Sequence, residues 1–411
     1  MMALRNRGFS IHCRIVGGLL ALLLIAGCAL PDQAFQNYVA ANKVSQWNGV
    51  LDALGGSVRR AESAGRGPLY NGAVSMNVPT QSGSINDIAR LFAGMDSSHS
   101  QSSAVSAHKL RMDRLWATHQ NLYRSPLQSW VSAEAGDVRG ANALFYPFSG
   151  PDFLFASVIC PGAETYVLCG LEPAEPLPRL DSLSQAEIER GLYGLHNSVS
   201  TLMTSSYFIT TDMRNDLVAT RFRGVLPIIL AFMARTGHTV DSVDTVRLDG
   251  AGNVTLAGSS GNTGLMIRCH SGFGSPKRVF YFRQDLSNGG GSGPLLAYVS
   301  RLGRVPAFTK SASYLMHEDG FSNIRDYLLR NSSAIIQDPS GVPYRDFIRH
   351  GWDLSLYGNH RGTLEIFSGG QQPDLTAAYS SGRHPVKPLN FGIGYLMNPQ
   401  TTCLMVGRPR R

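Results

Sequence analysis

Two carboxylates, a lysine and a histidine stand at positions in this chain where they could do chemistry. Asp152 follows the turn between two apolar runs in "FYPFSGPDFLFA", and Asp338 closes the apolar run "AIIQ". Lys310 and His317 flank the segment "SASYLM". Enzymes use carboxylates with Lys or His as general acids and bases. These four residues are therefore the catalytic candidates for a hydrolase or transferase.

The same residues also have ordinary structural interpretations. Asp152 stands where a helix should begin and can cap it. Asp338 begins Asp-Pro-Ser-Gly, which is typical of an Asx turn. Lys310 can pair with Glu172 or with Asp338, and His317, followed by two acids, is typical of a helix start. The residues alone leave open whether the protein is an enzyme.

The spacing of elements around the first turn predicts a Rossmann-like unit. An apolar run, the turn at Ser149 and Gly150, a short helix and a second apolar run precede Glu172 in "GLEP". In that layout the turn faces the ligand and an acid about twenty residues later binds ribose hydroxyls. The candidate ligand-binding residues are therefore Ser149, Gly150, Asp152 and Glu172. However, the turn is not G-x-G-x-x-G, and Pro151 would begin the helix where a pyrophosphate needs bare backbone. No cofactor is strongly implied.

The chain begins with a pattern typical of an export signal. Arg5, Arg7 and Arg14 precede the apolar stretch Ile15–Gly27, which is too short to span a bilayer comfortably. The stretch ends Leu-Ile-Ala-Gly-Cys28, which resembles the lipobox of bacterial lipoproteins. That resemblance implies cleavage before Cys28 and acylation, for example with palmitate, of its sulfur and new amino terminus. An ordinary secretory signal that contains a cysteine is the alternative.

A lipobox would place the mature protein in the bacterial cell envelope. Two or three acyl chains, at about 0.8 kcal/mol per buried methylene, would anchor it stably. Ala29 is not the Asp associated with inner-membrane retention, so the outer membrane is favoured, on either its periplasmic or its surface face.

Charge and cysteine content limit the other partners. The net charge of +8 falls to about +5 without the three signal arginines, and the basic residues are scattered, which excludes a nucleic-acid surface. Without Cys13 and a lipidated Cys28, four cysteines remain, which permits two disulfides in three pairings or four buried thiols. No His/Cys spacing suggests a metal site. The four remaining cysteines are Cys160, Cys169, Cys269 and Cys403.

The remaining motifs do not complete a catalytic site. Ser149 lacks the G-x-S-x-G pattern of a hydrolase elbow. Cys269 and His270 are adjacent, so on a strand they point to opposite faces. The glycine turn "YGNH" at 357–360 is interpreted as core and loop.

The chain is expected to have three parts: a signal peptide (1–27), a tether of short helices and a Ser/Gly-rich linker (28–107, with the linker extending over 94–108), and an α/β domain (108–411). Continuous apolar runs at 142–150, 164–173 and 334–341 predict buried strands, and 183–206 and 224–237 predict helices. This alternation predicts a Rossmann-like, mostly parallel sheet flanked by helices.

The body resembles two known groups of proteins. The first turn is similar to the first motif of class I methyltransferases, but S-adenosylmethionine is not normally supplied outside the cytoplasm. The blocks "YPFSGPDFLFA", "TYVLCGLEP", "SASYLMH", "QDPSG" and "LNFGIGY" resemble an uncharacterised bacterial family with many exported members and no established activity. In that family the "QDPSG" block usually has a second acid, and Pro339 stands in its place here.

Three functions follow as expectations. The first is a lipid-anchored envelope protein whose α/β domain binds a small molecule or another envelope protein. The second is an extracytoplasmic hydrolase or transferase, and the third is a degenerate methyltransferase-like fold without cofactor. The oligomeric state stays open.

Overall fold

The computed structural model describes residues 84–98, 102–205, 220–257, 264–272, 274–363, 365–382 and 384–410. The chain divides into two compact units, and nearly all described residues belong to the second, Arg66–Thr363 with Gly369–Arg411. The expected signal peptide, Cys28 and the tether as far as residue 83 lie outside the described residues.

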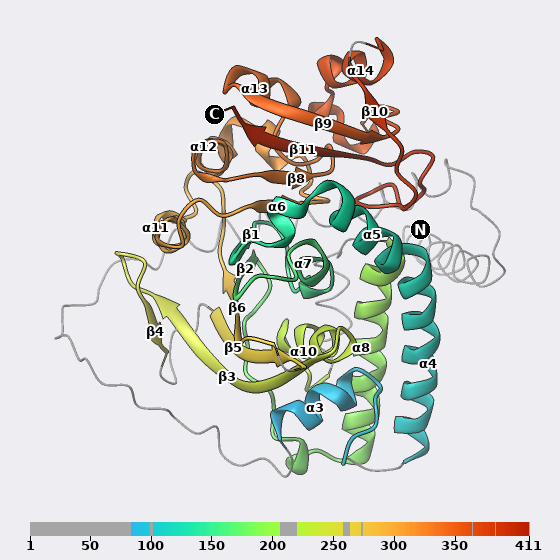
Figure 1. The fold of residues 1–411 in the computed structure, drawn as a ribbon. Helices are drawn as coiled ribbons and strands as arrows, with labels where there is room; N and C mark the ends of the chain where they lie inside the picture. Colours follow the sequence, from blue (N-terminus) through green and yellow to red (C-terminus); the bar gives the residue numbers. More distant parts are fainter. Residues whose placement is uncertain are drawn as a thin grey trace, which may run out of the picture. The chain divides into compact units, whose positions relative to one another are not determined.

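The described strands form one sheet of eleven strands (Figure 1). Its order is β10-β9-β11-β8-β7-β1-β2-β6-β5-β3-β4. The strands are β1 (Ala143–Tyr146), β2 (Thr165–Gly170), β3 (His238–Leu248), β4 (Val254–Leu256), β5 (Gly264–Ser271), β6 (Lys277–Arg283), β7 (Ala307–Thr309), β8 (Ile335–Gln337), β9 (Trp352–Gly358), β10 (Val386–Lys387) and β11 (Cys403–Pro409).

The sheet is mixed, which corrects the expectation of a mostly parallel one. Five of its ten pairings are parallel: β8–β7, β7–β1, β1–β2, β2–β6 and β9–β10. The block β5-β3-β4 joins β6 through antiparallel pairings, and β11 runs antiparallel between β8 and β9. The reason is the connections: β3, β4, β5 and β6 follow one another with no described helix between them, and only antiparallel strands pair across short connections.

The described helices precede β1 or lie between successive strands. They are α3 (Ile85–Phe92), α4 (Ser103–His119), α5 (Ser125–Glu134), α6 (Gly136–Arg139), α7 (Phe153–Ile159), α8 (Gln185–Ser205), α10 (Leu226–Arg235), α11 (Gly293–Arg301), α12 (Ser322–Asn331), α13 (Tyr344–Arg349) and α14 (Pro373–Ser380). Short turns of helix are the π-helix η1 (Gln120–Arg124) and the 3₁₀-helices η2 (Leu180–Ser182), η3 (Leu315–His317), η4 (Asp319–Phe321) and η5 (Glu365–Gly370).

Local capping explains where several helices begin. Ser184 and Glu187 form a reciprocal capping box before α8, near the start of the helix that the sequence predicts over 183–206. Ser84 caps α3 by accepting from the Asp87 N–H at 3.2 Å. Ser102 does the same for α4, which therefore begins at Ser103 and includes the last residues of the expected linker.

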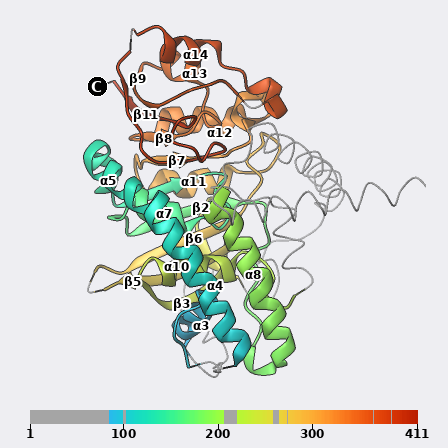
Figure 2. The same ribbon diagram turned by 90° about the vertical axis from the view of Figure 1, so that its right-hand side faces the viewer.

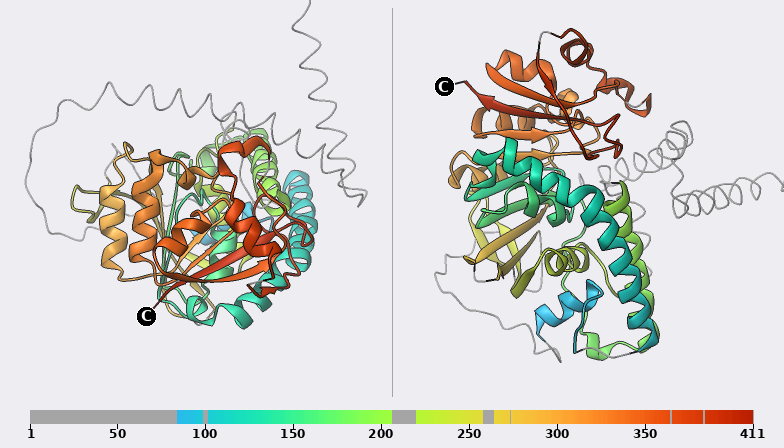
Figure 3. Two further views of the ribbon diagram at one scale, coloured as in Figure 1. Left: turned by 90° about the horizontal axis from the view of Figure 1, so that it is seen from above. Right: turned by 45° about the vertical axis from the view of Figure 1, so that its right-hand side comes forward.

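Helices cover both faces of the sheet (Figures 2 and 3). Successive residues of β1 point to opposite faces: Leu144 and Tyr146 join a core formed with α3, α5, α7, α8 and α10. Ala143 and Phe145 join a second core with α11, α12 and α13. This is why β1 is apolar at every position.

None of the helices in the described ranges combines the length and apolarity that crossing a membrane requires. The four cysteines of the body are buried free thiols, so the disulfide alternative is not realised. Burial raises the pKa of the Cys160, Cys169 and Cys269 thiols to about 12.

Candidate functional site

The chemistry-bearing residues gather where the strand order reverses. Strands β2 and β6 lie on one side of β1, and β7 and β8 lie on the other. Ligands of open α/β sheets bind outside the carboxyl ends of the strands at this reversal. Asp152 follows β1, Lys310 follows β7 and Asp338 follows β8, so all three stand at this edge.

Asp152 and Lys310 form a buried ion pair across this edge. The Asp152 side chain has one oxygen 2.9 Å from Lys310 Nζ, and the two residues are 0% and 3% exposed. The same oxygen accepts from the Tyr146 hydroxyl at 2.9 Å, and the other accepts from the Phe155 N–H at 3.0 Å. Asp152 is therefore both the predicted cap of α7 and the partner of Lys310.

The ion-pair partner of Lys310 differs from those that the sequence suggested. Strand β7 ends at Thr309, so Lys310 begins the following loop and its Nζ lies 4.4 Å from the centre of the Phe155 ring. Its ion-pair partner is Asp152, whereas the sequence suggested Glu172 or Asp338.

Asp338 is tied into the turn that follows β8. It accepts from the Ser311 N–H at 2.9 Å, from the Ser340 N–H at 3.0 Å and from the Ser340 hydroxyl. The residue is 2% exposed, and burial raises the pKa of its carboxyl group. The predicted Asx turn is present.

The turn at Ser149 and Gly150 is hydrogen-bonded to β2. Ser149 Oγ accepts from the Cys169 N–H at 3.0 Å, and the Gly150 N–H donates to the Cys169 carbonyl at 3.1 Å. Glu172, 5% exposed, accepts from the Tyr281 hydroxyl at 3.0 Å. All four predicted ligand-binding residues are thus held by neighbouring protein atoms.

His317 lies beside the turn after β8. It is half-buried in η3, and its ring centre is 5.0 Å from that of Tyr314. Burial lowers the pKa of His317 to about 4. The ring is therefore neutral at pH 7.

Sequence reasoning missed Tyr146 and His119 at this site. His119 ends α4 directly before the π-helix, and such bulges are frequent at functional sites. Its Nδ1–H donates to the Met203 carbonyl at 3.1 Å, and its ring lies 5.9 Å from that of Phe155. Burial lowers the pKa of His119 to about 4. The π-helix cannot be read from sequence, so no signal pointed to His119.

The Asp152, Lys310 and Asp338 side chains at the strand reversal are buried away from solvent. Asp152, Lys310 and Asp338 are each at most 3% exposed. A base without access to substrate or water cannot transfer a proton to it. Among the described residues, no group of three His, Cys, Asp or Glu could hold a metal ion.

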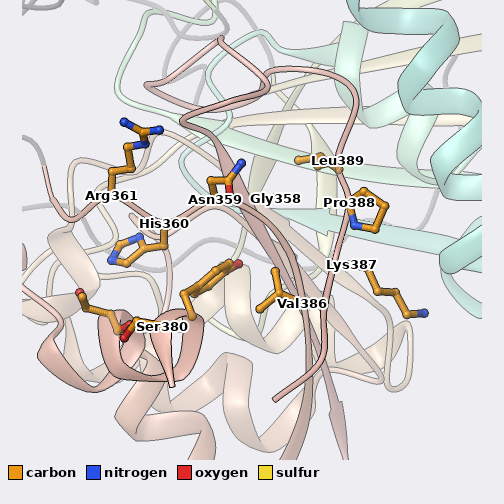
Figure 4. A pocket seen from close by; sticks show the side chains of 11 residues that line it. Gly358, Asn359, His360, Arg361, Ser380, Val386, Lys387, Pro388 and Leu389 are labelled. Atoms are coloured by element: carbon orange, nitrogen blue, oxygen red, sulfur yellow. The ribbon is translucent and has the colours of Figure 1, made fainter. Parts of the chain in front are cut away.

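A pocket of about 620 Å³ lies at another part of the same edge, beyond β9 and β10 (Figure 4). Its described lining comes from the loop after β9, from α14 and from the segment of β10. These residues are Gly358, Asn359, His360, Arg361, Thr376, Tyr379, Ser380, Val386, Lys387, Pro388 and Leu389. The sequence interpretation of "YGNH" as core and loop missed this pocket, because α14 and β10 complete it from about 20 residues further along the chain.

In comparisons with known proteins, no family model matches this chain, and no curated protein matches it.

Proposed function

We propose that this chain is a lipid-anchored protein of the bacterial cell envelope whose Rossmann-like α/β domain binds a ligand or partner. The support for the Rossmann-like arrangement is the order of the five central parallel strands. In chain order these are β1, β2, β6, β7 and β8, and across the sheet they read third, second, first, fourth, fifth. This is the order of doubly wound nucleotide-binding sheets.

One observation argues against both catalysis and nucleotide binding at the strand reversal: the buried Asp152–Lys310 ion pair stands where such sheets bind their ligand. A nucleotide there would have to displace a lysine and break a desolvated pair, which is strongly unfavourable. Glu172, which would bind the ribose, is bonded to Tyr281 instead. The fold is therefore proposed to be methyltransferase-like in strand order and to lack the cofactor.

Calorimetry tests this directly. The purified full chain is titrated with S-adenosylmethionine and with NAD, and a nucleotide-binding Rossmann protein serves as a positive control in the same buffer. No binding is expected up to a ligand concentration of about 1 mM. A Kd of about 1 mM corresponds to a binding free energy of only about 4 kcal/mol. Saturable binding below that concentration would contradict the cofactor-free proposal.

The lipid anchor is tested by labelling cells with radioactive palmitate. The wild-type chain and a Cys13→Ser variant should both be labelled, because the proposed cleavage removes Cys13. A Cys28→Ser variant should not be labelled. Label in Cys28→Ser would contradict the lipid anchor.

The alternative, an extracytoplasmic hydrolase or transferase, needs Asp152 or Asp338 to reach a substrate. Their burial opposes it. Asp152→Asn and Asp338→Asn variants should therefore keep whatever cellular phenotype the wild-type gene complements, provided that they fold. Loss of complementation by folded variants would favour the enzyme.

A further inference from the structure

The pocket beyond β9 has the position and size of a ligand site. Strand β9 runs parallel to β8, because both are antiparallel to β11, so its carboxyl end lies at the ligand edge of the sheet. The volume of about 620 Å³ lies within the range of about 300–1,000 Å³ that is typical of small-molecule pockets.

The neighbour that can select the tautomer of His360 is Cys403. Cys403 Sγ lies 3.5 Å from His360 Nδ1. Burial raises the pKa of the Cys403 thiol, so the thiol keeps its hydrogen and can donate it to Nδ1. Burial also lowers the pKa of His360 to about 4, so the ring is neutral, and when Nδ1 accepts from the thiol the one ring hydrogen is on Nε2.

Nε2 of His360 is buried and has no hydrogen-bond partner among the described residues, and with the thiol donating to Nδ1 it carries the ring hydrogen. Buried donors are rarely left unsatisfied in folded proteins, and each exception needs an explanation. Figure 4 shows the His360 ring between Arg361 and Ser380, at the wall of the pocket. A ligand that brings an acceptor to this wall would satisfy the donor.

The charge of the described lining is positive. It contains Arg361 and Lys387 and no Asp or Glu. Lys387 is paired with Glu134 at 2.6 Å, and its side chain extends away from His360 in Figure 4. Arg361 is exposed, and no described acid lies within ion-pair distance of it. Arg361 is therefore the cation available to an incoming anion.

The remaining wall is apolar. Val386, Pro388 and Leu389 line one side, and the Tyr379 ring lies 5.6 Å from the His360 ring, centre to centre. The Tyr379 hydroxyl faces the protein, since it donates to the Tyr357 carbonyl at 3.0 Å.

We propose that this pocket binds a small organic anion, with its carboxylate or phosphate group between His360 Nε2–H and the Arg361 guanidinium. The apolar or aromatic body of the ligand packs against Tyr379, Val386 and Leu389. This inference rests on the proposed binding function and names the class of its ligand. Cys403 is a positioning residue, since it sets the tautomer of His360 without lining the pocket.

The test is calorimetric titration of the full chain in the neutral detergent dodecyl maltoside. Benzoate, phenyl phosphate and benzamide are the probes, so that the first two distinguish carboxylate from phosphate and the third is the neutral isostere of benzoate. At least one anion should bind, and benzamide should bind at least tenfold more weakly. Arg361→Gln should weaken anion binding at least tenfold.

Arg410→Gln is the matched control, because it removes one exposed arginine that pairs with Asp353 outside the pocket. It should leave the affinity unchanged. In nitrogen-15 spectra, Cys403→Ala should shift His360 away from a single Nε2–H tautomer. This readout does not depend on a bound probe.

The inference is overturned if neither anion binds, if benzamide binds as tightly, or if Arg361→Gln and Arg410→Gln act alike. If Cys28 is still labelled with palmitate, such a result rejects the anion pocket and leaves the proposed lipid anchor standing. If the wild-type chain is not labelled but still binds an anion, the lipid anchor is rejected and the anion pocket stands.

Discussion

The Asp152–Lys310 pair is the residue-scale feature on which the functional interpretation depends. Both charges are removed from water, and their mutual attraction together with the Tyr146 and Phe155 hydrogen bonds offsets that cost. Such a pair contributes little net stability compared with apolar residues, but removing one partner leaves an unpaired buried charge.

Lys310→Met should therefore destabilise the protein by about 3–5 kcal/mol, measured by urea unfolding. The double variant Asp152→Asn/Lys310→Met should lose much less than the sum of the single changes, because Asn still caps α7 and no charge remains. Lys109→Met, at a half-exposed surface pair, is the matched control and should change stability little. Additive losses in the double variant would contradict the pairing.

A second residue-scale prediction concerns pH. His108 is 0% exposed, its Nε2–H donates to the Phe92 carbonyl at 3.0 Å, and burial lowers its pKa from 6.5 to about 4. The pKa of His108 is lower in the folded protein than in the unfolded chain. The stability that neutral, buried His108 contributes is therefore present above about pH 6.5 and is lost as the pH falls toward 4.

His108→Gln keeps a donor for the Phe92 carbonyl but cannot be protonated. Between pH 7 and pH 4.5 the wild type should lose about 2–3 kcal/mol more than this variant in urea unfolding. Equal losses in the two proteins would show that His108 does not carry this share of the acid sensitivity.

At the scale of elements, the loop after β7 closes the strand-reversal edge. Ser311, Ser313 and Tyr314 have φ values of 51°, 56° and 55°, in the left-handed region that is unfavourable for residues other than glycine. The Tyr395 hydroxyl donates to the Ser311 carbonyl at 2.8 Å and accepts from the Ser313 N–H at 3.0 Å. A distant segment of the chain therefore holds this strained loop in place.

Tyr395→Phe should destabilise the protein by about 1–3 kcal/mol, because it leaves the Ser313 N–H and the Ser311 carbonyl without this partner. Thermal unfolding measures the effect. Tyr193→Phe, at a tyrosine that is 58% exposed, is the control and should change the melting temperature little. A melting temperature for Tyr395→Phe equal to that of the control would mean that the loop is held by other contacts.

At the scale of the whole molecule, stability should be highest in the centre of the sheet. β1 and β2 are buried between two hydrophobic cores, whereas β4 and β10 are short strands at the two edges. Strand stability depends on burial and on pairing on both sides.

Amide hydrogen exchange should therefore be slowest in β1 and β2, close to the rate of global unfolding, and much faster in β4 and β10. Mass spectrometry of exchanged peptides resolves these segments. If β10 exchanged as slowly as β1, the edge next to the anion pocket would be part of the central folding unit.

The elements that sequence reasoning predicted correctly are those with strong local signals. The apolar run before Pro147, the helix cap at Asp152 and the turn at Asp338 all depend on residues near in sequence, and each is present. The parallel character of the sheet was overestimated. Apolar runs such as "GLMIRCHS" indicate buried strands but carry no information about strand direction.

At the candidate site, too, local features were predicted and long-range contacts were not. The sequence predicted Asp338 at the end of a strand and Asp152 at the start of a helix, and the structure has both there. The sequence could not show that Lys310 pairs with Asp152, because this contact joins residues far apart in the chain. The pocket around His360 was missed for the same reason: Cys403 and Tyr379 reach it from separate elements.

By itself the sequence determined the alternation of apolar strands and helices, the caps, and the lipobox-like pattern at Cys28. These follow from the local pattern of residue types, which sets backbone preference and burial period. Only the tertiary structure decided that the strand-reversal edge is filled by an ion pair and that an open pocket lies beyond β9. Both depend on which distant side chains share one space, because burial and charge pairing are properties of the packed chain.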